Sequence, residues 1–275
     1  MEKHSKNPIF NKICIIGVGL IGGSIGRAVK RHGLARWVIG VVRRDETAKK
    51  AVSLKAVDVA IKDLKEGVRG ADLVILCGPV STIESQLAFI KKRLSPNAIV
   101  IDVASSKRRI VEAARRHLKK NSFVGCHPMA GSEKTGVEHG CPYLFEKSVC
   151  FVTKAHPKVN RFWRALGATP VVISPEKHDD WAARASHLPH VLAFSIFQDL
   201  KSTVKLPLNP SLRSLGRLAK SDPALWADIL LSNRTPMLRA IANFQKNLTS
   251  FKGALQKSAA SALKRLIQKS NSHAA

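Results

Sequence analysis

Two short polar segments of this sequence carry side chains that can move protons. His127 opens the run His127-Pro128-Met129-Ala130-Gly131-Ser132-Glu133 after an expected strand at 123–126, and the segment 102–107, Asp-Val-Ala-Ser-Ser-Lys, ends another expected strand. Imidazole titrates near neutral pH, so His127 is a candidate general base. A single histidine is more often structural, but the carboxyl ends of neighbouring parallel strands meet at one sheet edge, where ligands bind. This position favours a catalytic role for His127.

A glycine turn indicates a phosphate site. The run Gly17-Val18-Gly19-Leu20-Ile21-Gly22 follows an expected strand at 12–16 and precedes an expected helix at 24–31. In a G-x-G-x-x-G pattern the first glycine permits a tight turn, the second lets the backbone approach a pyrophosphate, and the third lets the helix pack on the strand. The pattern alone is weak evidence, but its context predicts a nicotinamide dinucleotide site. Its expected residues are Gly17, Gly19, Leu20, Ile21 and Gly22.

The end of the second expected strand, at 37–42, bears on the choice of dinucleotide. Chains that bind NAD usually carry a carboxylate there, which bonds the 2′-hydroxyl of the adenosine ribose. This chain has Arg43 and Arg44 instead, and two guanidinium groups can clamp a 2′-phosphate. We therefore expect NADP as the preferred cofactor, with NAD as the alternative if Asp45 serves the ribose.

The segment after the fourth expected strand should line the same cleft. Cys77, Gly78, Pro79 and Val80 stand at the strand's carboxyl end, and we expect Thr82 to cap the next helix. Ligands of such sheets lie beyond the carboxyl ends of the strands, which places these five residues at the cofactor. The alternative is a plain loop without a ligand.

The hydrophobic pattern up to about residue 172 predicts the scaffold that holds these segments. Short apolar runs without polar alternation take turns with helical stretches, which is typical of a parallel sheet covered by helices on both faces. The expected strands are 12–16, 37–42, 56–61, 73–77, 98–102, 123–126, 148–153 and 169–173, and the expected helices are 24–31, 45–54, 63–69, 82–94, 107–118 and 160–166, with Asp45 as an N-cap. The sequence predicts an α/β fold with a doubly wound Rossmann domain over residues 1–173.

From about residue 174 the pattern becomes all helical, and we predict a C-terminal helical domain over 174–275. Its expected helices are 175–205, 210–219, 222–232 and 236–267, the last with Thr235 as N-cap and Pro236 at its first position. Apolar residues repeat along the last helix with 4-3-4-3-4 spacing, as in the seam of a coiled coil: Met237, Ile241, Phe244, Leu248, Phe251 and Leu255. Such a seam suits an intrachain core and subunit packing equally well. The expected assembly is a homodimer formed through these helices.

Composition limits the partners of the chain. It has 275 residues, with 46 Lys and Arg against 19 Asp and Glu, and a formal net charge of +27. The basic residues are scattered and aromatic residues make up 5%, so a solvated basic surface is favoured, an anionic substrate and cofactor come second, and nucleic acid comes last. No apolar run approaches the roughly 20 residues of a membrane span. We expect neither a nucleic acid nor a membrane as partner.

The cysteines and the N-terminus indicate the compartment. The chain has five cysteines, an odd number, and no pair has C-x-x-C spacing. Small buried thiols in a reducing cytosol fit this pattern best. The N-terminus lacks the apolar region of a secretory signal. We expect a cytoplasmic protein without a metal site.

Several motifs together resemble the prephenate/arogenate (cyclohexadienyl) dehydrogenase family. They are Gly17–Gly22, Asp102–Lys107, His127–Glu133, His178-Asp179, Ser186-His187-Leu188-Pro189-His190, and Arg217-Leu218-Ala219 followed by Asp222-Pro223-Ala224-Leu225-Trp226. The resemblance runs from the first strand to the helix after Arg234. Its His-Pro-Met and His-Leu-Pro-His motifs are specific, because other β-hydroxyacid-type dehydrogenases share the glycine turn and lack them.

The resemblance implies a role for each matching residue. His127 is the catalytic histidine that accepts a hydrogen bond from the ring hydroxyl of the substrate, Ser105 bonds that hydroxyl and the histidine, and Arg217 holds a substrate carboxylate. The residues implied to line the substrate pocket are His190, His187 and His178. The residues implied to form a gate at its mouth are Glu133, Asp179 and Trp226.

The reaction implied by the resemblance is an NAD(P)-dependent oxidative decarboxylation of prephenate or arogenate in tyrosine biosynthesis. Hydride leaves ring C4 for the nicotinamide while His127 draws on the hydroxyl proton, and loss of carbon dioxide makes the ring aromatic. The chain departs from the family pattern at Ser106, where an apolar residue is common, and Arg43-Arg44 resembles the members that use NADP. With no regulatory domain expected, feedback by tyrosine would act at the active site.

Two alternatives to this function remain open at the level of the sequence. One is another β-hydroxyacid or imine dehydrogenase or reductase that uses NADP. The other is a dinucleotide-sensing protein without catalysis. The sequence does not separate prephenate from arogenate, which differ only in a keto or amino group.

Overall fold

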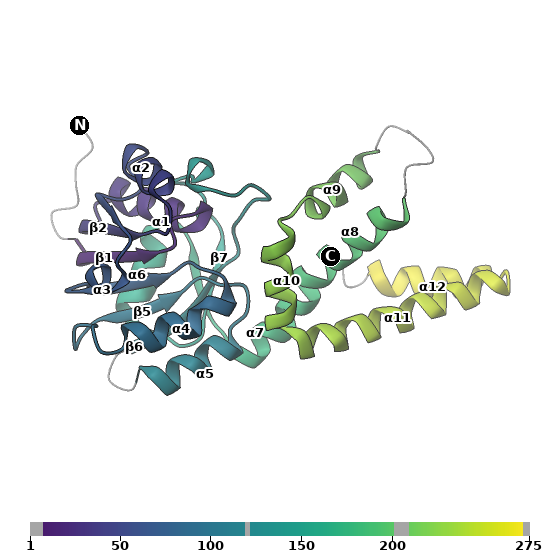
Figure 1. Cartoon of the computed structure of the whole chain (residues 1–275). Helices are drawn as coiled ribbons and strands as arrows, with labels where there is room; N and C mark the ends of the chain where they lie inside the picture. The colour runs from purple at the N-terminus through teal and green to yellow at the C-terminus, as the bar shows by residue number, and fades with distance from the viewer. Residues whose placement is uncertain (1–7, 119–121, 201–208, 272–275) are drawn as a thin grey trace.

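An eight-stranded sheet forms the N-terminal part of the protein, as a computed structural model shows for residues 8–118, 122–200 and 209–271 (Figure 1). The strands are β1 (Phe10–Ile16), β2 (Ala35–Val41), β3 (Val59–Ile61), β4 (Leu73–Leu76), β5 (Ile99–Asp102), β6 (Ser122–Pro128), β7 (Val149–Val152) and β8 (Thr169–Val172). Their order in the sheet is β3-β2-β1-β4-β5-β6-β7-β8. All neighbours are parallel except β6 and β7, which pair antiparallel. The predicted doubly wound, mostly parallel sheet is confirmed.

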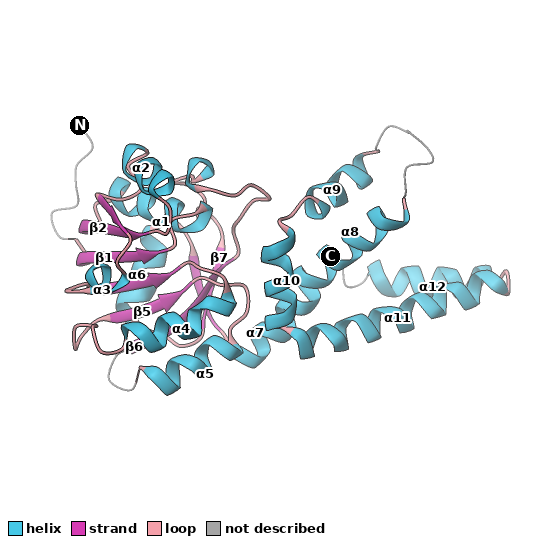
Figure 2. Ribbon diagram, in the orientation of Figure 1, coloured by secondary structure: helices cyan, strands magenta, loops and turns pink. Residues whose placement is uncertain are grey.

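Helices cover both faces of this sheet (Figure 2). They are α1 (Leu20–Arg31), α2 (Asp45–Ser53), α3 (Leu64–Val68), α4 (Val80–Ile90), α5 (Arg108–His117), the short 3₁₀ turn η1 (Val137–His139) and α6 (Pro157–Ala165). Strand β1 shows why its sequence lacks polar alternation. Ile13 and Ile15 belong to the core on one face of the sheet, whereas Cys14 and Ile16 belong to the core on the other. Both faces are therefore buried.

The C-terminal part is helical throughout its described residues. Its elements are α7 (Pro175–Ala182), the π-helical turn η2 (Ala183–His187), α8 (Leu188–Asp199), α9 (Pro210–Ala219), α10 (Pro223–Ser232), α11 (Arg234–Gln256) and α12 (Ala260–Asn271). Helix α7 packs on α5 and α10 packs on α4, which joins this part to the carboxyl edge of the sheet. Helices α11 and α12 form a hairpin that extends away from the sheet (Figure 2). No helix in the described ranges has the length and apolar character needed to cross a bilayer.

Several helix boundaries differ from the expectations by a few residues, and the largest differences are in the C-terminal part. The helix expected at 236–267 is two helices, because the chain turns at 257–259, where Ser258 has a φ of 49°. The helix expected at 175–205 contains the π turn η2 and ends at Asp199, and residues 201–208 lie outside the described residues. Helix α11 begins at Arg234 after Asn233, so Thr235 and Pro236 lie inside its first turn instead of at its cap.

Two predicted helix caps are also wrong, by three positions at Thr82 and by one position at Asp45. Helix α4 begins at Val80, and the Thr82 hydroxyl inside its first turn donates to the Pro79 carbonyl at 2.8 Å. Helix α2 is preceded by Arg44, which leaves Asp45 as its first residue. An acidic side chain stabilises the positive end of the helix dipole both at the N-cap and in the first turn. The sequence pattern therefore does not show which of these two positions Asp45 occupies.

The apolar seam of α11 is covered by this chain along only part of its length. Met237 is buried under η2, whereas Leu248 is 52% exposed and Leu255 is 64% exposed. An intrachain core therefore accounts for the N-terminal part of the seam and leaves the C-terminal part facing outward.

Candidate active site

A cavity of about 540 Å³ lies where the carboxyl edge of the sheet faces helices α8, α9 and α10. Four segments from the sheet line it: the glycine turn, the β4–α4 loop, the β5–α5 loop and the chain after β6. The predicted site residues in its lining are Gly19, Leu20, Ile21, Gly22, Cys77, Gly78, Pro79, Val80, Ser105, His127, Glu133, His190, Arg217 and Trp226. The fold thus brings together in one cavity most of the residues that the sequence analysis singled out.

The glycine turn has the geometry that a dinucleotide phosphate needs. Gly17 has a φ of +94°, which favours glycine, and its backbone N–H donates to the Val41 carbonyl at the end of β2. A Cβ on Gly22 would lie 2.1 Å from the carbonyl oxygen of Gly17, so only glycine fits there. No side chain caps the N-terminus of α1 at Gly19, and a Cβ on Gly19 would meet no atom within 4 Å. The first N–H groups of α1 are available to an anion.

Two arginines stand beside this turn at the end of β2. Arg43 and Arg44 are exposed, and within the described residues neither lies within 4 Å of a carboxylate. The neighbouring Asp45 carboxylate instead pairs with the Lys62 ammonium at 2.7 Å. Neither arginine belongs to the lining of the cavity, and neither do Gly17 and Thr82.

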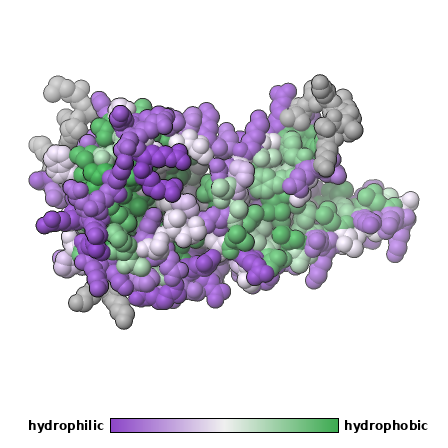
Figure 3. Space-filling model, in the orientation of Figure 1, coloured by the Kyte–Doolittle hydropathy of each residue, from purple (hydrophilic) through white to green (hydrophobic). Residues whose placement is uncertain are grey.

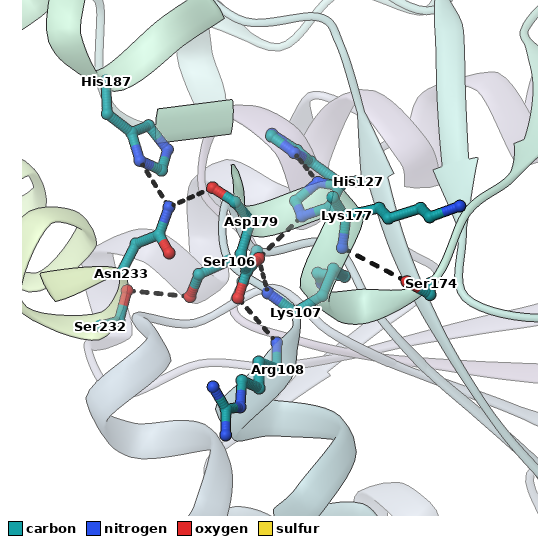
Figure 4. A network of polar contacts seen from close by, with 12 residues as sticks. Ser106, Lys107, Arg108, His127, Ser174, Lys177, Asp179, His187, Ser232 and Asn233 are labelled. Carbon is teal, nitrogen blue, oxygen red and sulfur yellow. Dashed lines mark hydrogen bonds and ion pairs between the residues drawn. The ribbon is translucent and has the colours of Figure 1, made fainter. Parts of the chain in front are cut away.

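A chain of three side chains leads away from the cavity behind His127 (Figure 4). His127 Nδ1 lies 2.9 Å from His178 Nε2, and His178 Nδ1 lies 2.8 Å from Asp179 Oδ1. The Asp179 carboxylate accepts the backbone N–H groups of Lys107, at 2.7 Å, and Arg108, at 2.9 Å, at the start of α5. Helix α7 carries both His178 and Asp179, so its packing on α5 brings them to the sheet.

Burial controls the protonation of this histidine pair. His127 lies at the carboxyl end of β6 and is 8% exposed, and His178 is fully buried. Burial, with the neighbouring His178, Lys107 and His187, lowers the pKa of His127 well below its usual value. Burial also lowers the pKa of His178, although the Asp179 carboxylate opposes that shift. Both rings are therefore neutral at physiological pH.

A buried ion pair supports the strand end from which His127 projects. Lys107 and Asp102 are fully buried and contact each other, and the Lys107 ammonium also donates to the Cys126 carbonyl at 2.7 Å. Burial raises the pKa of the Asp102 carboxyl, and the Lys107 ammonium opposes this shift. The pair joins the ends of β5 and β6, which holds the residue before His127.

Two more histidines come from the segment around the π turn η2. His190 faces the cavity, where its ring stacks on Trp226 with centroids 3.6 Å apart, and its Nδ1 lies 2.9 Å from the Ser186 carbonyl. His187 is fully buried, and its Nδ1 lies 3.2 Å from the Asn233 amide nitrogen. Burial lowers the pKa of His190, and it lowers that of His187 to about 4. The π turn shifts the register of the helix, which is a common device near functional sites.

Two cations of the cavity lining, Lys134 and Arg217, have no ion-pair partner among the described residues, and Arg217 comes from the helical part. Arg217, near the end of α9, is exposed and has no carboxylate within 4 Å in the described part of the chain. Glu133 lies on the same cavity lining, after β6, and Ser105 lines the cavity between Asp102 and Lys107. The arrangement can bind a carboxylate at Arg217 and accept a proton at His127.

Three predicted substrate residues lie outside the cavity lining. Asp179 does not stand at the mouth, because the backbone N–H groups of α5 hold its carboxylate inside the protein. His178 is separated from the cavity by His127, and His187 faces Asn233. Trp226, 9% exposed, lines the cavity as a stacking partner of His190.

The sequence analysis missed a group of polar residues that join the two parts of the molecule. Ser106 Oγ donates to Ser232 Oγ at 2.8 Å, and Asn233 Nδ2 donates to the Asp179 carbonyl at 2.8 Å (Figure 4). The Asp228 carboxylate accepts the Ser81 N–H at the start of α4, at 3.1 Å. The hydroxyl of Ser106 has a buried partner, which explains a serine where an apolar residue is common. Ser232 is the last residue of α10 and Asn233 links it to α11, and the sequence contains no motif that points to either residue.

A dinucleotide turn, a neutral buried histidine and an unpaired arginine on one cavity are features of a dehydrogenase of the Rossmann class, here with a helical C-terminal part. The nucleotide-binding domain of prephenate dehydrogenase matches residues 25–175 as a family pattern, and the prephenate dehydrogenase dimerization domain matches residues 174–269. The chain therefore belongs to the prephenate dehydrogenase family, which is a family of oxidoreductases. The predicted resemblance is confirmed.

Known relatives agree over nearly the whole chain. A cyclohexadienyl dehydrogenase of Zymomonas mobilis is 30% identical over 261 residues, which are 90% of this chain and 89% of that protein. The structure of prephenate dehydrogenase from Aquifex aeolicus with hydroxyphenyl propionate and NAD+ superposes with a TM-score of 0.86 at 31% identity, covering 96% of this chain and 97% of that one. The structure of Synechocystis arogenate dehydrogenase has a TM-score of 0.79 at 28% identity, covering 95% and 98%.

Proposed function

We propose that this chain oxidises and decarboxylates prephenate or arogenate with NAD(P), so that the product has an aromatic ring. The observation that carries the proposal is the single cavity lined by the glycine turn, His127 and Arg217. The named activities of the relatives support the choice of substrate class. An acceptor for a proton, a cation for a carboxylate and a turn for a dinucleotide are the three groups that such a reaction needs.

Each residue of the proposed site has its own role in the reaction. Neutral His127 accepts the proton of the ring hydroxyl, and Ser105 bonds the same hydroxyl. The glycine turn would hold the dinucleotide, whose nicotinamide would supply the hydride acceptor for the ring carbon that carries this hydroxyl. The bond to the ring carboxylate then breaks, carbon dioxide leaves, and the electron pair of that bond completes the aromatic ring as a phenolate. The His127 imidazolium returns the proton to this oxygen, which gives the phenol and restores the neutral base. Arg217 holds a substrate carboxylate through two parallel hydrogen bonds, which its planar guanidinium favours.

An assay of both substrates with both dinucleotides tests this function. We expect reduction of the dinucleotide, followed by absorbance, together with release of carbon dioxide. His127→Asn should abolish turnover while the protein still binds the dinucleotide. A folded protein that binds the dinucleotide and turns over neither substrate would overturn the proposal.

The proposed cofactor preference is NADP. Arg43 and Arg44 are exposed beside the glycine turn, and the Asp45 carboxylate is paired with Lys62, which leaves the ribose end without a free acidic group in the described part of this loop. Guanidinium groups bind a 2′-phosphate, whereas a carboxylate would repel it. The double variant Arg43→Ala, Arg44→Ala should lower the ratio of kcat/KM with NADP to kcat/KM with NAD. An unchanged ratio contradicts the preference.

The proposed organisation is a cofactor domain at 1–173 and a substrate domain at 174–275 that forms a homodimer. Exposed large apolar residues gather on the helical part (Figure 3): Ile196, Leu200, Leu225, Leu231, Leu238, Leu248, Leu255 and Ile267. Exposed apolar patches of this kind usually mark protein interfaces, and the match to a dimerization domain supports a second copy as the partner. The free thiols at all five cysteine positions support a reducing cytoplasm as the compartment.

A further inference from the structure

We propose that Asp179 and His178 are positioning residues that fix the tautomer of His127, so that its Nε2 is the bare nitrogen that faces the substrate. The chain of contacts is Asp179–His178–His127, with N···O and N···N distances of 2.8 and 2.9 Å. Figure 4 labels its two ends, Asp179 and His127. The catalytic consequence of this inference rests on the proposed function, whereas the tautomer itself is a property of the free protein.

At one end of this chain of contacts, the Asp179 carboxylate acts as a hydrogen-bond acceptor. Asp179 receives three donors, which are the backbone N–H groups of Lys107 and Arg108 and a ring nitrogen of His178. Oδ1 of Asp179 faces the Lys107 N–H and the His178 ring, and Oδ2 accepts the Arg108 N–H, so both oxygens act as acceptors here. The side-chain amide of Asn233 donates to the backbone carbonyl of Asp179, which holds the residue in place.

The acceptor role of Asp179 determines which ring nitrogen carries the proton, first in His178 and then in His127. Because Asp179 only accepts, His178 must donate from Nδ1, and a neutral His178 is left with a bare Nε2. That Nε2 lies against His127 Nδ1, so His127 must donate from Nδ1. A neutral His127 has no second proton, and its Nε2 is therefore a base. The cavity is lined by His127 and not by His178, which places the free nitrogen on the substrate side.

The surroundings keep the rings of His127 and His178 neutral before the reaction. The direction of the hydrogen bonds between them therefore decides which nitrogen of His127 is basic. His127 faces His178, His187 and the Lys107 ammonium, and His178 faces Asp179, Lys107 and Asp102. Burial lowers the pKa of each ring. The edge of Phe151 packs on His178 with centroids 5.7 Å apart, which keeps the His178 ring from turning freely.

The same chain stabilises His127 after it has taken up a proton. The hydroxyl proton of the substrate moves to Nε2, and the imidazolium keeps its Nδ1 proton in the bond to His178. The negative charge of Asp179 lies one ring away, and the Lys107 charge is already paired with Asp102. A buried carboxylate that orients a histidine and stabilises its cation acts in this way in other enzymes.

The first test reads the tautomer directly. In protein labelled with ¹⁵N-histidine, without substrate and at pH 7.5, we expect His127 Nδ1 to carry the proton and Nε2 to give the signal of a bare nitrogen. His127→Asn assigns the signal. The result that overturns the inference is a proton on Nε2 of His127. This measurement needs no turnover. It therefore tests the tautomer even if the proposed function is wrong.

The second test compares variants of His178 with a control next to the chain. His178→Leu removes the acceptor of the Nδ1 proton and should lower kcat by about 10²- to 10⁴-fold, with KM and dinucleotide binding changed by less than about threefold. His178→Gln keeps an oxygen that can accept and should retain at least about tenfold more activity than His178→Leu. Asp180→Asn, which removes an exposed partner of Arg239, should leave kcat unchanged. Equal kcat values in His178→Leu and the wild type would overturn the inference.

Discussion

Lowering the pH from 7.5 to 5.0 should destabilise this protein, and His187 should be one of the buried histidines that contribute. The ring is fully buried, and burial lowers its pKa from 6.5 to about 4. In the unfolded chain a histidine titrates near 6.5. Between these values the unfolded state binds a proton that the folded state does not, so the free energy of unfolding falls as the pH drops. At pH 5 this difference in proton binding is worth roughly 2 kcal/mol, and it approaches about 3 kcal/mol near pH 4.

Urea unfolding at pH 7.5 and pH 5.0 measures the effect. His187→Gln removes the titrating ring and keeps a polar group beside Asn233, so its loss of stability between the two pH values should be smaller than that of the wild type by about 2 kcal/mol. His139→Gln, a change at an exposed histidine in η1, is the matched control and should lose as much as the wild type. If the wild type and His187→Gln lose the same stability, burial of His187 is not a source of acid sensitivity and the reasoning is refuted.

Four further results are expected. The acid limb of kcat/KM for the proposed oxidation should lie below pH 6.5, since burial lowers the pKa of His127; a limb above 6.5 in the pH–rate profile would contradict this. Gly22→Ala places a Cβ 2.1 Å from the Gly17 carbonyl oxygen and should weaken dinucleotide binding at least about tenfold, which a fluorescence titration measures; unchanged affinity would argue against the turn as the phosphate site. Trp226→Leu removes the ring stacked on His190 and should raise the KM of the carbon substrate about tenfold with the KM of the dinucleotide unchanged; steady-state kinetics that show the reverse pattern would place Trp226 at the cofactor. The double variant Leu248→Asp, Leu255→Asp puts charges on the exposed seam and should turn a dimer into monomers in light scattering, and a persistent dimer would locate the interface elsewhere.

Local patterns in the sequence were sufficient for the scaffold and for the cofactor turn. A strand buried on both faces has no polar residue to interrupt it, and Ile13 to Ile16 shows that signal clearly. A turn of Gly17 to Gly22 between a strand and a helix allows few structures, because Gly17 has a positive φ and a Cβ on Gly22 would lie 2.1 Å from the Gly17 carbonyl oxygen. The sheet edge that collects His127 and Ser105 follows from the same rule, since parallel strands end on one side.

Helix ends and interruptions were predicted less well. The turn at Ser258 lies between the packed helices α11 and α12, and the π turn that ends at His187 packs on α7, α8 and α11. No local residue pattern requires either of them. The exposed part of the α11 seam has the same spacing as the buried part, so only the structure separates them. Packing between distant segments decides the helix ends, the π turn and the exposure of the seam. Local helix propensity does not contain this information.

The sequence by itself determined which residues could do chemistry, and the tertiary structure decided which of them touch the cavity and which act through others. His127 and His178 are 51 positions apart, and their contact exists because α7 packs against the edge of the sheet. The same packing turns Asp179 away from the cavity mouth toward the first N–H groups of α5. Side-chain type is a local property, whereas the direction in which a side chain points depends on contacts between elements far apart in the chain.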